Sequence, residues 1–331
     1  MTLTDQPRVD NWSVLPVTTH DHPPIADFLA TTPGLGGRKF AADSRDVAEQ
    51  LDGAFPGAAK VVRDTSGRIR GYAVLHRPHG VEPELFADFV FDHNVPAHLT
   101  DAVVGDIVAR YSEESPSIPE SFFRTIIGTD QREAIAALTR RGAHEEAQFI
   151  RTRKPLHGES PDALAATEIK GVTVVGWPEI IERDLGEQVR RLQFDTFLEH
   201  FGNMSKTPEL WRHHIQSRSF TPDFSVAALD EKGEVIGYVL GSTYTAGAGL
   251  TEERSAHTDY IGVRRDRRRH GIGELLLKKI WLAALRRGLA VASLGTDINN
   301  KSNAHLLYHR LGYVAVENSS AYRIDHGAQT R

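Results

Sequence analysis

The chain has 331 residues, 40% of them hydrophobic and 25% charged, and a formal net charge of −5 at pH 7. This length predicts about two domains, and the absence of cysteine excludes disulfides, thiolate metal sites and acyl-cysteine intermediates. The negative charge argues against general nucleic-acid binding. With no signal-peptide core and no apolar run of roughly 18–20 residues, we expect no membrane segment and a cytoplasmic location.

The first half of the chain reads as strands joined by tight turns and followed by helices. An Asp/Gly turn over 64–67 precedes a strand that begins near Gly71, and a further strand covers Leu85–Phe91. The segment 92–100 has neither an arginine nor paired glycines. We therefore expect a side chain to cap the helix that begins near Thr100.

The composition of one segment predicts the boundary between the two domains. Proline, glycine and serine cluster between Lys154 and Ala166, which is typical of a linker. We therefore divide the chain into a first domain over residues 1–153, a linker over 154–168 and a second domain over 169–331.

The second half alternates strands and helices, which predicts a three-layer α/β domain. The expected elements are a strand at 172–175, a helix through 189–201, a helix from Thr207, strands at 224–228 and 235–243, a strand at 257–263, a helix from Gly271, a strand at 289–294, a helix at 304–311 and a last hairpin through 313–324.

The two halves repeat one pattern at a spacing near 166 residues. The matching segments are Asp64–Tyr72 with Asp230–Tyr238, Ile127–Asp130 with Leu294–Asp297, and Leu138–Gly142 with Tyr308–Gly312. Three matches in the same order are improbable by chance. We infer two tandem copies of the same unit.

The most specific motif lies between the strand that ends at Val263 and the helix that begins near Gly271. An arginine-rich turn leads into Arg268-Arg269-His270-Gly271-Ile272-Gly273-Glu274. Free amides at a helix start favour an anion, and Gly271 and Gly273 let the backbone approach it closely. The spacing fits neither the nucleoside triphosphate loop nor the dinucleotide fingerprint.

This Arg-x-x-Gly-x-Gly motif resembles the pyrophosphate loop of the GNAT acyltransferases, over about residues 172–325. The resemblance implies two GNAT-like domains, each a mixed, mostly antiparallel sheet flanked by helices, with acetyl-CoA as co-substrate. It assigns the pantetheine arm to the backbone of Ile261, Gly262 and Val263, and the pyrophosphate to the amides of 269–274 with the Arg268 side chain. The side chains of Arg264, Arg265 and Arg267 would screen charge or reach the ribose phosphate.

Tyr308 lies in a segment similar to the late motif of the same family, whose tyrosine hydrogen-bonds the coenzyme sulfur. A phenol is a suitable proton donor to a departing thiolate. Asn299 or Asn303 would contact the pantetheine or cap this helix. The family's asparagine position is Lys301 here, so the motif is shifted.

His257 stands eleven residues before Arg268, where several relatives carry a catalytic glutamate. Asp259 points to the same face of the strand. We take His257 and Asp259 as candidate bases for the acceptor amine, because an imidazole accepts protons near neutral pH. The alternative is two ordinary polar residues, and Glu252 and Glu253 are spare candidates.

We consider other histidines and aromatic residues for a metal site and for the acceptor pocket. His305 and His309 are four apart on one helix, but no third ligand is evident, so we expect no metal. The acceptor pocket in relatives is built where this chain has Trp211, His213, His214 and the run 199–202. These residues equally fit simple packing of helices on the sheet.

The first copy lacks the chemistry, because Leu138 stands at the tyrosine position and the loop arginine and glycines are missing. We expect a degenerate domain that shapes the active one. The tandem order is similar to that of mycothiol synthase and its actinobacterial relatives. This similarity implies an N-acetyltransferase that binds acetyl-CoA and a small polar amine together in a ternary complex. The enzyme would be a monomer or a homodimer.

Alternatives remain for the substrate and for the class of function. The acceptor is a mycothiol precursor, an aminoglycoside-type antibiotic or another metabolite. A non-catalytic acyl-CoA-binding protein is the rival from another class. A nucleic-acid binder is set aside, since no aromatic residues are interleaved with the arginines.

Overall fold

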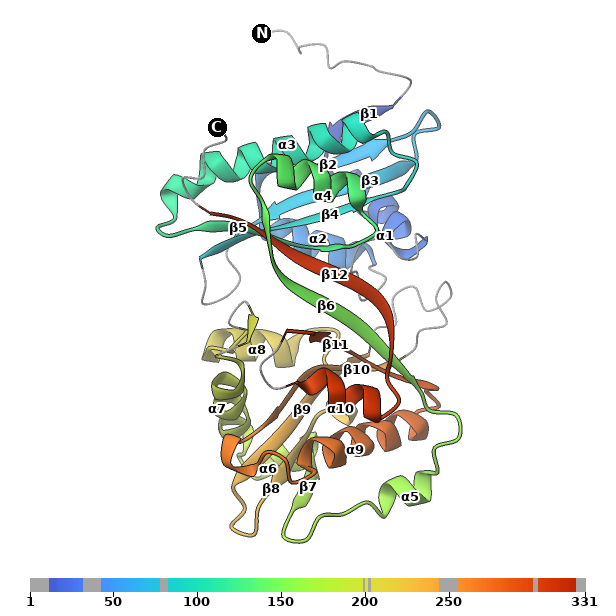
Figure 1. The fold of residues 1–331 in the computed structure, drawn as a ribbon, viewed down its shortest axis with the longest axis vertical. Coiled ribbons are helices and arrows are strands. Elements are labelled where there is room, and N and C mark those ends of the chain that lie inside the picture. Colours follow the sequence, from blue (N-terminus) through green and yellow to red (C-terminus); the bar gives the residue numbers. More distant parts are fainter. Residues whose placement is uncertain are drawn as a thin grey trace. The chain divides into compact units, whose positions relative to one another are not determined.

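The structure, a computed structural model, describes residues 12–31, 43–77, 83–198, 200–201, 204–243, 255–299 and 303–325. The chain forms two compact units. One comprises Met1–His79, Pro83–Gln148 and Asn318–Arg331, and the other comprises Gly80–Glu82 and Phe149–Glu317. Elements are labelled in Figure 1.

The first unit contains the strands β1 (Ser13–Pro16), β2 (Ala54–Arg63), β3 (Ile69–His76), β4 (Glu84–Phe91), β5 (Phe122–Gly128) and the start of β6 (His144–Pro155). Its helices are α1 (His22–Thr31), α2 (Ser44–Asp52), α3 (Ala97–Glu114) and α4 (Arg132–Arg140), with short 3-10 turns at Thr19–Asp21 and Ser115–Ser117.

The second unit contains the end of β6 and the strands β7 (Thr173–Gly176), β8 (Val226–Leu229), β9 (Val235–Thr243), β10 (Ser255–Val263), β11 (Val291–Asp297) and the start of β12 (Val314–Asp325). Its helices are α5 (Pro161–Ala165), α6 (Trp177–Glu182), α7 (Gly186–Phe197), α8 (Pro208–Gln216), α9 (Ile272–Arg286) and α10 (Ala304–Arg310), with 3-10 turns at Pro222–Phe224 and η5 (Arg265–Arg267).

Both sheets are mixed and mostly antiparallel. The strand order is β1-β2-β3-β4-β5-β12 in the first unit and β6-β11-β10-β9-β8-β7 in the second. One parallel pair interrupts each sheet, β4 with β5 and β10 with β11. The expected α/β class, with mixed sheets and flanking helices, is confirmed.

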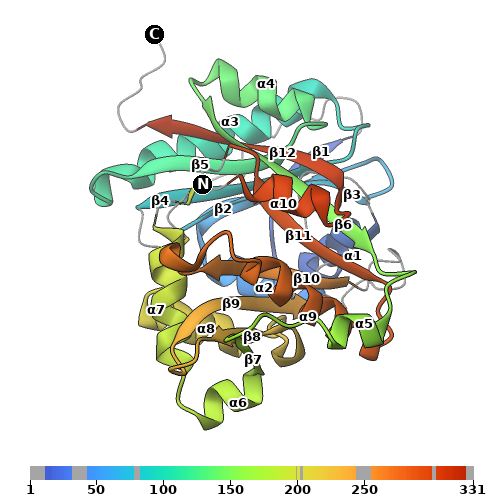
Figure 2. The same ribbon diagram turned by 60° about the horizontal axis from the view of Figure 1, so that its bottom comes forward.

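Helices cover both faces of the sheet in the second unit (Figure 2). On one face, α9 and α10 bury an apolar cluster that includes Leu276, Trp281 and Tyr308. On the other, α6, α7 and α8 bury a cluster around Trp177 and Trp211. The first unit likewise has two clusters, one under α3 and α4 and one under α1 and α2.

The closing strands are exchanged between the two copies. The end of β6, Phe149–Pro155, pairs with β11 in the second unit. The end of β12, Ser319–Asp325, pairs with β5 in the first. The expected last hairpin through 313–324 is therefore wrong, because the segment runs on as one strand. Long-range pairing, rather than a local turn, decides where such a strand lies.

The segment expected to be a linker is structured. Its helix α5 buries Leu164 in the core under α9, and Lys279 Nζ donates to the carbonyl oxygen of Ala165 at 3.0 Å. The boundary between the two compact units therefore lies between Gln148 and Phe149, earlier than the expected linker over 154–168. Of the prolines that suggested a linker, Pro155 ends β6 and Pro161 begins α5.

The helix after β4 also differs from the prediction. It begins at Ala97 instead of near Thr100, and the residue at its N-cap is Pro96, which supplies no side-chain hydrogen bond. The expected side-chain cap is therefore wrong. Proline has no side-chain acceptor, and the backbone carbonyl of Pro96 instead accepts the N–H groups of Leu99 at 2.9 Å and Thr100 at 3.2 Å.

Candidate functional site

The site begins where the two parallel strands of the second unit separate. The pair β10 and β11 is in register only from Ser255 opposite Val291 to Thr258 opposite Leu294. Beyond Thr258, β10 continues along β9 alone, while β11 continues along β6. Among the described residues, one edge of β10 is therefore left without a neighbouring strand.

A β-bulge lies at the point of separation. Thr258 pairs with Gly241 and Tyr260 pairs with Leu240, so Asp259 is an extra residue on β10. A bulge redirects the side chain that it contains and often lies beside an active site. It brings Asp259 to the point where the strands diverge.

The open edge is formed by the backbone of Ile261 and Val263. Arg264 N–H donates to Ile236 O at 2.9 Å, and hydrogen-bonded and non-bonded pairs alternate along an antiparallel ladder. Val263 lies opposite Gly237, and Ile261 lies opposite Val239. Both are non-bonded pairs of the ladder, so their N–H and C=O groups point away from β9. An extended ligand could add to this edge as a strand.

Gly262 has a different position from the one expected. By the same alternation its backbone groups face β9, opposite Tyr238. A side chain here would meet the Tyr238 ring, because an added Cβ would lie 2.5 Å from its Cε1 atom. Gly262 thus admits the buried Tyr238, whose hydroxyl pairs with Thr196 Oγ1 at 3.0 Å.

The loop after β10 presents free amides at the start of α9. Gly271 is the N-cap, has φ +79° and provides no side-chain cap. Its carbonyl accepts the Leu275 N–H at 2.9 Å, so the N–H groups of Ile272, Gly273 and Glu274 have no partner within the helix. Together with the helix dipole, these amides form a favourable anion site.

Side chains hold the loop in this shape. Arg268 Nε donates to Val263 O at 3.1 Å, which brings its guanidinium to the open edge of β10. His270 Nδ1 lies 2.8 Å from Arg268 O. Arg269 has φ +65°, a left-handed conformation that non-glycine residues rarely adopt.

Two of the loop arginines are held by acidic side chains. Arg264 Nε donates to Asp266 Oδ1 at 2.8 Å, and Arg267 Nη2 lies 3.4 Å from Asp230 Oδ2. Both arginines were expected to screen or reach a phosphate. These ion pairs form a network that involves Arg264 and Arg267. The loop has three further arginines outside it, Arg265, Arg268 and Arg269.

Glu274 was expected to contribute its backbone amide. Its side chain turns away from the loop, since it lies 2.8 Å from Lys278 Nζ and 3.4 Å from Arg310 Nη2. The second of these contacts links the first turn of α9 to α10. Gly273 lies in the same contact, because an added Cβ there would be 3.6 Å from Leu307 Cδ2.

Tyr308 lies on α10, next to the start of α9. It is buried, and its ring meets that of Tyr313 edge-on at 6.0 Å. Burial raises the pKa of Tyr308 to about 12, so the phenol is protonated at neutral pH. Tyr313 is held in turn by Trp281 Nε1, which donates to its hydroxyl at 2.9 Å.

The two asparagines do not behave alike. Asn303 is the N-cap of α10, but it has φ +53° and its side chain makes no capping hydrogen bond. The capping role considered for it is therefore wrong. Asn299 donates its backbone N–H to Asp297 Oδ1 at 2.8 Å, which fixes the turn after β11.

His257 and Asp259 are brought together as expected from their spacing. His257 is buried, and its Nε2 lies 4.0 Å from Asp259 Oδ1. Its Nδ1 lies 2.8 Å from Ser293 Oγ on the adjacent strand β11. Ser242 Oγ on β9 donates to the other oxygen of Asp259. These serines orient the imidazole and the carboxylate, and no sequence motif indicated either of them.

His214 is a third polar group at the same carboxylate. Its Nε2 lies 4.0 Å from Asp259 Oδ2, and this buried nitrogen has no hydrogen-bond partner among the described residues. Burial lowers the pKa of His214 to about 4, with a smaller contribution from the positive charge of Lys206. The imidazole is therefore neutral at pH 7.

The other residues of the expected acceptor pocket have mixed positions. Trp211 belongs to the core, with its ring 6.2 Å from that of Trp177, and His213 is exposed. His200 stacks on Phe197 at 4.8 Å. Five residues considered earlier lie outside the described ranges, namely Glu199, Gly202, Glu252, Glu253 and Lys301.

The described residues were also expected to hold no metal and no membrane segment. Within the described ranges, no group of three or more histidine, aspartate or glutamate side chains is placed to hold a metal ion. Across the same parts of the chain, no helix combines the length and hydropathy needed to cross a membrane.

Part of the chain matches a known protein family. Residues 187–313 match the model of the acetyltransferase (GNAT) family, a segment that includes the whole of β10, the loop and Tyr308. No curated protein sequence matches the chain significantly.

Solved structures share the fold over nearly the whole chain. A GCN5-related N-acetyltransferase from Sphaerobacter thermophilus has a TM-score of 0.72 at 21% identity, covering 96% of each chain. A tandem GNAT protein from the clavulanic acid biosynthesis pathway has 0.67 at 17%, covering 96% of this chain and 99% of its own. Saccharomyces cerevisiae N-myristoyltransferase with bound myristoyl-CoA has 0.55 at 10%, covering 99% and 82%.

Proposed function

Because residues 187–313 form a GNAT acetyltransferase domain, we propose that this acyltransferase transfers an acetyl group from acetyl-CoA to the amine of a small polar metabolite. The observation that carries the proposal is the continuity of two features. The open edge of β10 at Ile261 and Val263 leads directly into the amides at the start of α9.

These features fit the two parts of a coenzyme A molecule. The pantetheine arm has amide groups that would pair with the backbone of Ile261 and Val263 as an added strand. Its pyrophosphate would lie on the amides of 269–274, beside the guanidinium of Arg268. Gly271, with φ +79°, is the position where a side chain would strain this loop.

The reaction is a direct attack within a ternary complex. The acceptor nitrogen bonds to the thioester carbonyl carbon, the carbon–sulfur bond breaks, and the departing sulfur takes a proton. His257 and Asp259 would take the proton of the amine, directly or through water, because both lie where β10 and β11 diverge.

Tyr308 would supply the proton to the sulfur. Its burial keeps the phenol protonated at neutral pH, which a proton donor requires. Helix α10, which carries Tyr308, packs beside the first turn of α9. Tyr308 and the start of α9 share one apolar cluster, so the phenol lies on the same face of the sheet as the proposed coenzyme site.

The acceptor is proposed as a small polar amine. Asp259, with the neutral His214 and with His257 around it, offers a carboxylate and imidazole nitrogens to an amine. A mycothiol-type precursor with a cysteinyl amine is one candidate. An aminoglycoside-type antibiotic or another metabolite is the other.

An acetyl-CoA assay over a panel of amines tests the proposal. We expect at least one acceptor, among cysteinyl glycosides, aminoglycosides, polyamines and amino acids, to release free coenzyme. In Tyr308→Phe we expect the turnover number to fall by about 100-fold with unchanged coenzyme affinity. If coenzyme A binds but no acceptor reacts, the protein is a non-catalytic acyl-CoA-binding protein instead.

A further inference from the structure

The turn between β8 and β9 is built on one carboxylate, that of Asp230. Its Oδ1 accepts the backbone N–H groups of Lys232 at 3.0 Å and Glu234 at 3.1 Å. The Asp230 N–H donates to Glu234 O at 3.0 Å. This oxygen is thereby used by the turn itself, and the side chain is only 8% exposed.

The second oxygen of Asp230 faces the loop after β10. Its Oδ2 lies 3.4 Å from Arg267 Nη2 and 3.9 Å from Arg264 Nη2. Arg264 also contacts Glu234 Oε2 at 3.1 Å and Asp266 Oδ1 at 2.8 Å. One turn therefore holds both ends of η5, the turn that leads into the coenzyme loop.

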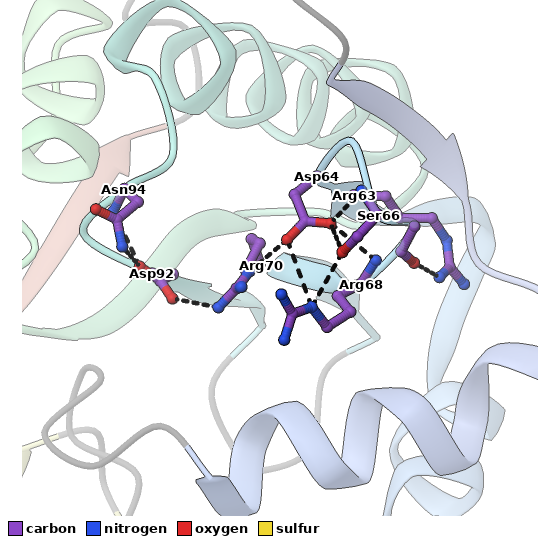
Figure 3. A network of polar contacts seen from close by, with 8 residues as sticks. Arg63, Asp64, Ser66, Arg68, Arg70, Asp92 and Asn94 are labelled. Carbon is purple, nitrogen blue, oxygen red and sulfur yellow. Dashed lines mark hydrogen bonds and ion pairs between the residues drawn. The ribbon is translucent and has the colours of Figure 1, made fainter.

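The first unit has the same aspartate anchor, but its cation lies in a different place (Figure 3). Asp64 Oδ1 accepts the N–H groups of Ser66 and Arg68, as Asp230 Oδ1 does in its own turn. Its Oδ2 accepts from Arg70 on β3 at 2.8 Å, and Arg70 also donates to Asp92 at 3.1 Å. Here the cation comes from the strand.

Sheet register shows that these positions correspond. Asp92 N–H donates to Arg70 O at 2.7 Å, and Arg264 N–H donates to Ile236 O at 2.9 Å. Asp92 is thus replaced by Arg264, and Arg70 by Ile236. The cation has moved from the strand to the loop, while the aspartate of the turn is present in both units.

We propose that Asp230 is a positioning residue for the coenzyme, because it holds Arg264 and Arg267 so that the amides of 269–274 stay in their binding arrangement. The inference rests on the proposed function. The loop needs such support, since Arg269 and Gly271 both have left-handed backbone conformations. A non-glycine residue keeps that conformation only when its surroundings impose it.

Asp230→Asn tests the proposal, because two explanations predict opposite signs. If Asp230 acts only through its charge, removal of a negative charge near a phosphate site strengthens coenzyme binding. If it positions the loop, binding weakens. The asparagine Oδ1 still accepts the two backbone N–H groups, so the turn is retained.

We expect the dissociation constant of coenzyme A, measured by calorimetry at low salt, to rise about three- to fivefold in Asp230→Asn. The turnover number at saturating acetyl-CoA should not change. Amides of 269–274 should exchange hydrogen faster in the variant than in the wild type.

Two matched variants serve as controls. Glu231→Gln removes the same charge from the adjacent, exposed residue, and Asp64→Asn removes the corresponding anchor from the first unit. Neither should weaken coenzyme binding. The proposal is overturned if Asp230→Asn binds coenzyme A as tightly as Glu231→Gln does. If the wild type does not bind coenzyme A, the proposed function itself fails.

Discussion

Gln131 and Phe91 in the first unit are joined by two hydrogen bonds. Phe91 N–H donates to Gln131 Oε1, and Gln131 Nε2 donates to Phe91 O, both at 3.1 Å. Phe91 lies opposite Gly71, as Val263 lies opposite Gly237 in the second unit. The carboxamide of Gln131 therefore occupies the strand edge that corresponds to the proposed pantetheine site.

From this pair we predict one coenzyme per chain. The first unit's edge is already filled by a buried side chain, and the helix after β4 has Pro96 at its N-cap instead of a glycine. Calorimetry should give a stoichiometry of one. Gly271→Val should abolish binding, because φ +79° is unfavourable for a β-branched residue. Two sites per chain, or binding that persists in Gly271→Val, would contradict this.

The buried chain from His257 to Ser255 predicts graded effects on the rate. His257 contacts Ser293 Oγ at 2.8 Å, and Ser293 contacts Ser255 Oγ at 2.7 Å. His257→Gln should lower the turnover number by about 100-fold or more, because the proton acceptor is lost. Ser293→Ala should cause a smaller loss, since only the orientation of the ring is relaxed.

Steady-state kinetics with a responsive acceptor measure both variants. The coenzyme affinity serves as the control, and it should stay at the wild-type value in each. A Ser293→Ala variant slower than His257→Gln would show that the serine has a different role.

His214 predicts a dependence of stability on pH. Its pKa is lowered by burial to about 4, below the ordinary value near 6.5. Between these values the unfolded chain binds a proton that the folded chain does not. Above about pH 6.5 the burial of the neutral imidazole costs no stability. As the pH falls towards 4, the free energy of unfolding decreases by up to about 3 kcal/mol.

Denaturant unfolding at several pH values checks this prediction. His214→Gln should reduce the slope of the unfolding free energy between pH 6.5 and 4. His213→Gln is the control, because His213 is exposed on the same helix. An unchanged slope in His214→Gln would show that other groups cause the acid sensitivity.

The exchanged strands predict how the chain tolerates truncation. A fragment of 169–317 lacks Phe149–Pro155, so β11 loses β6, one of its two neighbouring strands, and exposes an unpaired edge. We expect this fragment to aggregate or to unfold without cooperativity. A fragment of 149–317, which matches the second compact unit, should unfold in one transition. Equal behaviour of the two fragments in thermal unfolding would contradict the importance of this pairing.

The strand, turn and helix around the proposed coenzyme loop were predictable because their signal is local. Strand, turn and helix follow one another between Tyr260 and Arg286, and backbone conformation at Gly271 depends on neighbours in the chain. The assignment of Gly262 shows the limit of local reading. Its neighbours have their backbone on the open edge, whereas Gly262 itself makes room for Tyr238.

The surroundings of His257 and Asp259 could be predicted only in part. The spacing of His257 and Asp259 on one strand indicated that the two lie together. Their partners Ser293, Ser242 and His214 come from three other elements. A sequence contains no register between distant segments, so these contacts had no signal that spacing could reveal.

By itself the sequence determined the α/β class, the tandem repeat and the strand–turn–helix that would hold a coenzyme, because hydrophobic period and glycine placement act within a few residues. Tertiary structure decided which strand closes each sheet, what surrounds Asp259, and that Gln131 fills the corresponding edge of the first unit. Those features depend on pairing between segments far apart in the chain, and their energies are settled only when the whole fold forms.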